Sequence, residues 1–205
     1  MHLPICCPKR TRASLFAAVC LLVAGGVHAE DAPAGHDPAA HASSGIKQEL
    51  IAGITEADFL KLGDKSKTAK ITLIAAYSQE NYGMNFNGFS KGKAVYTVPT
   101  GWTVEVTFIN PSPVPHSAMV VDRDMVKKVQ VGPPAFEGAS VPSPTMGMSL
   151  KKSVFTFVAS ESGDYALCCG FPAHAISGHW VTFNVRDNLN KPTLKLGDGE
   201  TREAK

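Results

Sequence analysis

The sequence has no long run of basic residues and little net charge. Its 205 residues carry 20 Lys and Arg against 18 Asp and Glu, which gives a formal net charge of +2. Nucleic-acid binders usually gather Lys and Arg in a patch or stripe, and none is present here. Hydrophobic residues make up 44% and charged residues 19%, so the chain has enough apolar material for a core. The composition excludes wholesale disorder and argues against nucleic acid as a partner.

An apolar run long enough to span a bilayer is also missing. The uncharged stretch 14–26 has about 13 residues, whereas a spanning helix needs roughly 20. Three basic residues precede this stretch, and Val27-His28-Ala29 after it resembles a signal-peptidase cleavage site. We interpret residues 1–29 as a signal peptide cleaved near Ala29, rather than an uncleaved anchor. This predicts a periplasmic protein with no stable membrane span after cleavage.

Cysteine is scarce in the rest of the chain. Three of the five cysteines lie within residues 1–29, so only Cys168 and Cys169 remain after cleavage. Adjacent cysteines rarely form a disulfide, because disulfide geometry strains such a short link. Successive side chains of a strand point to opposite faces. We therefore expect no disulfide and different surroundings for the two thiols.

Composition divides the remaining chain into three parts. Residues 30–54 are expected to be a flexible leader, because residues 30–48 are rich in Ala, Pro, Gly, Ser and His. Residues 55–186 form one domain, which starts with a short helix predicted between Thr55 and Gly63. Residues 187–205 are polar and are expected to be a frayed C-terminal tail.

Short alternating runs separated by Gly and Pro fill the domain. They predict strands at 70–77, 84–88, 94–98, 102–110, 118–121, 154–158, 165–169 and 180–185. Such a series is typical of an all-β protein, and we expect an antiparallel β-sandwich. The proline-rich stretch 132–147 is expected to be an ordered loop.

One loop carries most of the chemistry. Cys169, His174 and His179 follow one another at spacings of five residues between two predicted strands. His116 comes shortly after strand 102–110, behind two stiffening prolines. Two imidazoles and a thiolate form the trigonal His₂Cys set that selects copper, with a weak axial ligand completing the site.

These residues also carry a family resemblance. Residues 71–185 resemble a cupredoxin, and within that family they are most similar to the sulfocyanin and rusticyanin branch. The segments that match are Asn85–Gly88, Val98–Gly101, Pro115–Ser117 and the Cys169-x4-His174 loop with Ser177, Gly178 and Trp180 after it. The resemblance implies a Greek-key sandwich of eight strands that holds one copper per chain. It also implies single-electron transfer with redox partners such as a cytochrome or a terminal oxidase, and carries His116, Cys169 and His174 over as ligands.

The fourth ligand position departs from the family pattern. Met usually stands five residues after the second His, and this sequence has His179 there. Imidazole is a stronger donor than a thioether and favours Cu(II), so we expect a lower reduction potential and a colour shifted from blue toward green or red. The red copper protein nitrosocyanin is similar in having His at this loop position. His179 as a non-ligand, and Met146 or Met148 as the axial ligand, remain alternatives.

Three further interpretations concern neighbouring residues. Cys168 is expected to point into the sandwich as a small hydrophobe rather than to bind a second metal. Asn87 is expected either to donate a hydrogen bond to the thiolate or to form a turn. Phe171, Pro172, Ala173 and Ile176 are expected to surround an edge of His174 with apolar surface, where redox partners dock in this family.

Other functions stay open at this stage. A red or green copper site that binds nitric oxide or oxygen, a copper carrier and a structural zinc domain are the alternatives. The enzyme question is undecided, with electron transfer favoured. A serine hydrolase has little support, because the sequence has no G-x-S-x-G motif. No oligomeric state is predicted.

Overall fold

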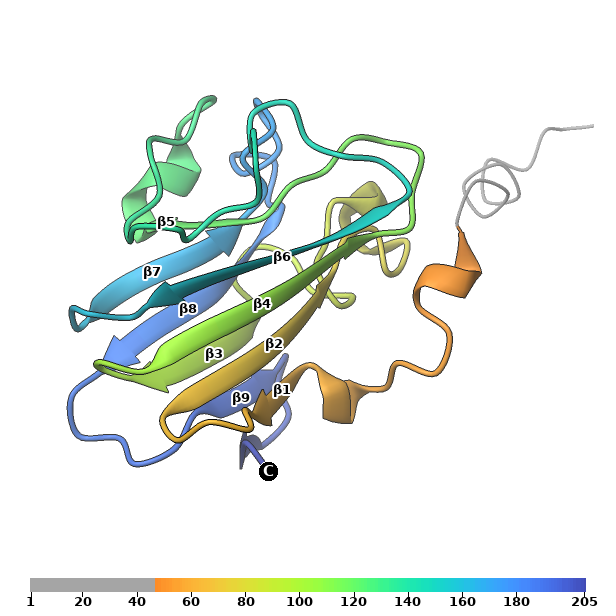
Figure 1. Ribbon diagram of the computed structural model, residues 1–205. Helices are drawn as coiled ribbons and strands as arrows, with labels where there is room; N and C mark the ends of the chain where they lie inside the picture. Colours follow the sequence, from red (N-terminus) through yellow and green to blue (C-terminus); the bar gives the residue numbers. More distant parts are fainter. Residues whose placement is uncertain (1–46) are drawn as a thin grey trace, which may run out of the picture. The chain divides into compact units, whose positions relative to one another are not determined.

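The computed structural model describes residues 47–205 and shows an all-β protein with two layers of strands (Figure 1). The predicted signal peptide and most of the predicted leader lie outside the described residues. The strands are β1 (Leu60–Leu62), β2 (Thr68–Ile74), β3 (Ala94–Pro99), β4 (Thr103–Asn110), β5 (Met119–Asp122), β6 (Lys151–Val158), β7 (Gly163–Cys168), β8 (Trp180–Arg186), β9 (Thr193–Leu196) and β10 (Thr201–Glu203). Four 3₁₀ turns accompany them, η1 (Gln48–Leu50), η2 (Glu56–Asp58), η3 (Glu80–Gly83) and η4 (Arg123–Lys127). No helix within residues 47–205 is long and apolar enough to cross a membrane.

The strands form two mixed sheets. One sheet has the order β1-β2-β4-β6 and the other the order β10-β9-β3-β8-β7-β5. Most neighbours are antiparallel, but β2 pairs with β4 and β3 pairs with β8 in parallel. Parallel neighbours need a crossover connection, which β3 in the opposite sheet supplies between β2 and β4. The expected β-sandwich is confirmed, and the purely antiparallel pairing is wrong because alternation reveals the buried face but not the direction of a neighbour.

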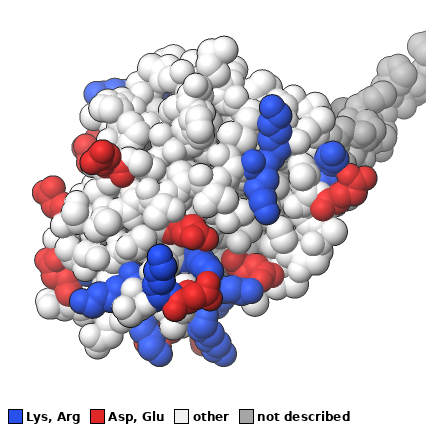
Figure 2. All heavy atoms as spheres, viewed as in Figure 1, with Lys and Arg blue, Asp and Glu red and all other residues white. Residues whose placement is uncertain are grey.

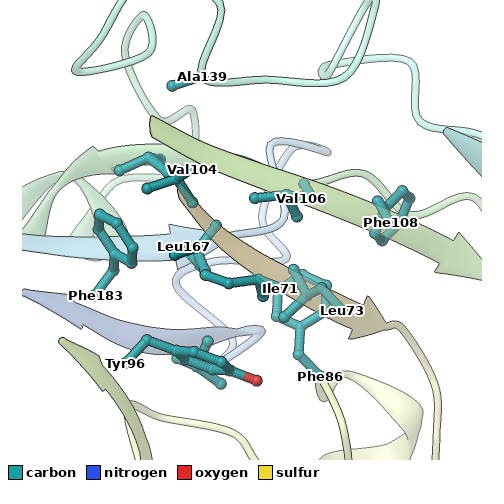
Figure 3. Close-up of a cluster of buried hydrophobic side chains, with 14 of the residues drawn as sticks. Ile71, Leu73, Phe86, Tyr96, Val104, Val106, Phe108, Ala139, Leu167 and Phe183 are labelled. Carbon is teal, nitrogen blue, oxygen red and sulfur yellow. The ribbon is translucent and has the colours of Figure 1, made fainter. Parts of the chain in front are cut away.

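The core lies between the two sheets. On β4, Val104, Val106 and Phe108 are fully buried, as their alternation predicts. They meet Phe183 and Leu167 from the opposite sheet in one apolar cluster (Figure 3). Burying side chains of this size contributes roughly 1.5–3 kcal/mol each. This packed layer gives the loops at the ends of the strands a rigid base.

Two predicted elements near the start of the domain are wrong. Thr55 does begin a helical turn, but η2 lasts only one turn and Leu60–Leu62 continues as β1 on the edge of β2. Side chains of a strand alternate between its two faces, and in β1 Leu60 points to the core face, where it is buried. The predicted strand 84–88 is a tight turn instead, since Asn87 and Gly88 both have positive φ.

The C-terminal residues are not a frayed tail. β9 pairs with β3, and β10 folds back onto β9. Leu194 of β9 is fully buried, so this short strand belongs to the main core. The polar composition of residues 187–205 gave little sign of its three buried residues, which are Pro192, Leu194 and Ala204.

Candidate metal centre

The four predicted ligands meet at one end of the sandwich. His116 lies between β4 and β5, and its backbone pairs with Met148 across an isolated bridge. Cys169 directly follows β7, and His174 and His179 lie in the loop that leads to β8. Because β4, β7 and β8 are fixed by the core, the chain brings together residues that are more than 50 positions apart.

The ligand loop closes on itself through backbone hydrogen bonds. The Cys169 N–H donates to the His179 carbonyl at 3.0 Å, and the His179 N–H donates to the His174 carbonyl at 3.0 Å. The chain turns at Ala173 and Gly178, which both have positive φ. Gly178 has φ +100°, a conformation that L side chains rarely adopt, so the glycine allows this turn. The loop therefore holds all three of its donors in one place.

The distances between donor atoms suit a single small ion. One donor atom from each of His116, Cys169, His174 and His179 lies within 4.8 Å of every other. The Nδ1 atoms of His116 and His174 are 3.3 Å apart, and Cys169 Sγ lies 3.4 Å from His174 Nδ1. Donors bound about 2.0–2.3 Å from one shared ion are separated by roughly 3.3–3.8 Å. The two separations that involve His174 Nδ1 lie in this range.

His179, like Cys169, is a fully enclosed donor. Its side chain is fully buried, its ring lies 4.2 Å from the Phe86 ring, and its Nε2 is 3.1 Å from the Asn85 carbonyl. Among the described residues, its Nδ1 is the one buried side-chain nitrogen or oxygen without a hydrogen-bond partner. A buried polar atom without a partner is costly unless a ligand satisfies it. This unpaired nitrogen marks the place that a metal would fill.

Burial favours the neutral form of all four donors. It lowers the pKa of His116 from its ordinary value near 6.5 to about 4, with a further contribution from His174. Burial also lowers the pKa of His174, and it moves that of His179 well below the ordinary range. It raises the pKa of the Cys169 thiol. The imidazoles are therefore ready to donate lone pairs, whereas the thiol must release its proton when a metal binds.

Two polar groups of Ser117 lie beside the Cys169 sulfur. Its N–H donates to Cys169 Sγ at 3.3 Å, and its hydroxyl lies 3.7 Å from the same sulfur while accepting from the Gly170 N–H at 2.8 Å. Hydrogen bonds to the charged form stabilise a thiolate. The sequence reasoning missed this role, although Ser117 directly follows a predicted ligand.

Asn87 does not contact the thiolate. Its side chain accepts from the Ile74 N–H at 2.7 Å, and donates to the Thr72 carbonyl at 2.8 Å and the Tyr96 hydroxyl at 2.9 Å. These contacts join the 84–88 turn to β2 and β3. Of the two predicted roles, the structure supports the one in turn formation.

Cys168 is buried on the other side of its sheet. It belongs to a second apolar cluster with Met119, Val126 and Trp180, whereas Cys169 belongs to the main core. The opposite surroundings predicted for the two thiols are confirmed. The predicted direction of Cys168 is wrong, because it faces away from the space between the sheets.

The two methionines proposed as alternative axial ligands differ in exposure. Met146 is 71% exposed, and Met148 packs partly buried against the main core. Among the His, Cys, Asp and Glu side chains of the described residues, His179 is the fourth member of the donor cluster.

His174 is the donor closest to the surface. It is partly exposed, whereas the other three are buried, and its ring lies 4.7 Å from the Phe171 ring. Ile176 and Val129 are exposed, and the Val129 carbonyl accepts from the Ala173 N–H in the ligand loop. In Figure 2, the end of the molecule with these loops is mostly uncharged, and Lys, Arg, Asp and Glu gather toward the other end. The centre therefore approaches the surface through an apolar patch.

Three comparisons place the chain among known proteins. A model of the Sulfocyanin (SoxE) domain matches residues 55–194. Sulfocyanin of Sulfolobus acidocaldarius is 28% identical over 138 residues, which cover 62% of this chain and 68% of that protein. Rusticyanin from Thiobacillus ferrooxidans is similar in structure, with 20% identity, a TM-score of 0.45 and coverage of 63% of this chain and 89% of that one. Auracyanin from Roseiflexus castenholzii gives 26% identity, a TM-score of 0.42 and coverage of 59% and 98%.

The family match and the donor cluster agree on the cofactor. Cupredoxins bind one copper, and the thiolate and imidazoles gathered here are donors that suit copper in both oxidation states. The predicted cofactor, one copper per chain, is thus confirmed. Because the family model covers more than half of the chain and includes all four clustered donors, the chain belongs to the sulfocyanin family of cupredoxins.

Proposed function

We propose that this protein carries single electrons between redox partners in the periplasm, with copper held by His116, Cys169, His174 and His179. The observation that supports it best is the enclosure of the donor set, in which three donors are buried and one reaches the surface. When bound, copper supplies one-electron chemistry by alternating between Cu(II) and Cu(I). The protein makes and breaks no substrate bond.

The residues around the donors limit rearrangement. Backbone hydrogen bonds link Cys169, His174 and His179 within the ligand loop, and the Ser117 N–H donates to the Cys169 sulfur. Burial of His116, Cys169 and His179 keeps water away from the site. A preorganised, dry environment means that few groups must move when the charge of the site changes.

The apolar patch around His174 suits brief docking. Phe171 and Ile176 supply apolar contact area beside the partly exposed imidazole. After removal of residues 1–29 the chain would have 17 basic against 18 acidic residues, so long-range electrostatic steering is weak. A redox protein such as a cytochrome or a terminal oxidase is the partner that we propose for this patch.

Its location follows from the proposed signal peptide. Residues 1–29 combine a basic start, a short apolar run and small residues near Ala29. The two remaining thiols, Cys168 and Cys169, are free and buried, so the domain needs no disulfide in an oxidising compartment. We propose export with cleavage near Ala29, which N-terminal sequencing of the exported protein would test.

Metal analysis with visible and EPR spectra of protein purified from its own source tests the function. We expect one copper per chain, a strong sulfur-to-copper absorption and rapid reversible reduction without substrate turnover. A colourless protein loaded with zinc would overturn the redox proposal. Binding of azide or nitric oxide to the oxidised site would favour the small-molecule alternative, and rapid release of copper to an acceptor protein would favour a carrier.

A further inference from the structure

One segment of the chain holds the end of the ligand loop at four successive residues. This segment runs from residue 81 to residue 92, and we call it the clamp segment. Its contacts are Asn81 Nδ2 to the Ser177 carbonyl at 2.9 Å, Lys91 N to the Gly178 carbonyl at 2.8 Å, the Asn85 carbonyl to His179 Nε2 at 3.1 Å, and Gly92 N to the Trp180 carbonyl at 3.0 Å. The contact with His179 is the one among these that reaches a donor side chain.

The Asn85 carbonyl decides which nitrogen of His179 carries a proton. A carbonyl oxygen can only accept a hydrogen bond, so the bond at 3.1 Å requires a proton on Nε2. The neutral imidazole then has its lone pair on Nδ1, which is buried and has no hydrogen-bond partner. His179 belongs to the donor cluster, so this nitrogen is the one left to bind a metal. Phe86 covers one face of the ring at 4.2 Å and leaves little room for rotation.

The Asn85 side chain holds the turn that carries this carbonyl, and the carbonyl also accepts from the Ala76 N–H at 3.0 Å. The side chain is fully buried, and its amide donates to the carbonyls of Ser78 and Glu80, both at 2.8 Å. Its Oδ1 accepts from the Gly88 N–H at 3.2 Å and from the Ser78 N–H at 3.4 Å. These bonds tie together the two ends of the turn from which the carbonyl points at His179.

We propose that Asn85 is a positioning residue for the metal centre, because its buried side chain holds the carbonyl that orients His179 for metal binding through Nδ1. The proposal deepens the proposed function and rests on copper binding at these four residues. Groups that hold the second nitrogen of a metal-binding His set its tautomer and ring orientation.

Asn87 provides a matched control. It is also buried in the clamp segment and makes three hydrogen bonds, but these reach β2 and β3 and none reaches a donor residue. Its φ of +53° suits glycine, so Asn87→Gly removes the amide without straining the backbone. Asn85→Ala and Asn87→Gly therefore both weaken the turn, and only the first affects His179.

The experiment uses full-length protein with ¹⁵N-labelled histidine, loaded with zinc for NMR and with Cu(II) for EPR and affinity measurements. In the wild type we expect His179 as a single tautomer with its proton on Nε2. Asn85→Ala should mix the tautomers, change the Cu(II) EPR spectrum and lower Cu(II) affinity by roughly 10- to 100-fold. Asn87→Gly should keep the wild-type tautomer, spectrum and affinity.

Three results would overturn the proposal. These are a wild-type His179 with its proton on Nδ1, an Asn85→Ala variant indistinguishable from the wild type, or an Asn87→Gly variant that loses as much as Asn85→Ala. If Asn85→Ala does not fold, the same measurements on Asn85→Ser decide, since serine retains one short polar group. A wild type that takes up no copper contradicts the proposed function instead, and the zinc-loaded NMR readout distinguishes that case.

Discussion

At the scale of single residues, His179 stands where the family resemblance leads us to expect a methionine. His179 belongs to the donor cluster, and its Nδ1 is buried without a hydrogen-bond partner. We expect His179→Met to weaken Cu(II) binding relative to Cu(I), because a thioether is a weaker donor. A relative loss of roughly 10- to 100-fold corresponds to an increase of about 60 to 120 mV in reduction potential, with a colour change toward blue.

Voltammetry and visible spectra of both proteins check this prediction. Met148→Leu is the control, since Met148 was the alternative axial ligand and packs against the main core. An unchanged potential in His179→Met together with a shifted potential in Met148→Leu would reverse the assignment.

The sequence alone identified the four clustered donors but not the groups that hold them. Cys169, His174 and His179 share one loop, so their spacing was a usable signal. Ser117 and Cys169 are 52 positions apart, and their contact exists only because β5 pairs with β7. The same limit applies to Asn85, because its contact with His179 runs from a backbone carbonyl to a residue 94 positions away and forms only in the folded chain.

At the scale of elements, β9 is a short strand with a large expected contribution to stability. Leu194 is fully buried in the main core, and its neighbour Lys195 is partly exposed. We expect Leu194→Ala to lower the free energy of unfolding by about 2–5 kcal/mol through lost burial and the cavity left behind. Lys195→Ala should change it by less than about 0.5 kcal/mol. Urea unfolding of both variants measures the difference, and equal small losses would mean that this edge frays.

The turn η2 carries a carboxylate that responds to acid. The Lys61 ammonium, and then the Thr55 N–H and hydroxyl, lower the pKa of Asp58 from near 3.8 to about 2. Between these values the unfolded chain binds more protons than the folded one, so this stabilisation is present above pH 3.8 and is lost as the pH falls toward 2. Asp58→Asn should therefore flatten the decline in stability over this range. Acid titration of both proteins followed by circular dichroism tests this, and identical slopes would contradict it.

Long alternating segments were the elements that the sequence predicted best. Residues 102–110 became β4 almost unchanged, because Val104, Val106 and Phe108 mark one buried face. The short strands β1 and β9 were missed, because three or four residues show too little alternation to identify a strand. At β1 the helix-start signal of Thr55 favoured a helix, and at β9 the polar composition of residues 187–205 favoured a tail. The parallel pairing of β2 with β4 was missed because it depends on where β3 lies.

At the scale of the whole molecule, the metal is expected to stabilise the fold. His116 lies between β4 and β5, and the other three donors lie between β7 and β8. The four therefore meet only in the folded chain. A ligand that binds only the folded state adds about 2.7 kcal/mol when its free concentration is 100 times the dissociation constant. Removal of copper should lower the melting temperature, as calorimetry can measure. Cys169→Ala should show little gain on addition of copper, and a full gain in that variant would exclude the thiolate as a ligand.

Because Cys168 and Cys169 are adjacent, the copper site depends on the register in which β7 pairs with its neighbours. β7 places Tyr165 and Leu167 in the main core, with Cys169 following on the same side, and it places Ala166 and Cys168 in the second cluster. A shift of one residue in its pairing with β5 and β8 would exchange the two faces. The wrong sulfur would then face the histidines, and the protein would still present a cysteine there. The parity of strand pairing therefore selects the metal ligand, and faithful folding of β7 is a condition for correct metallation.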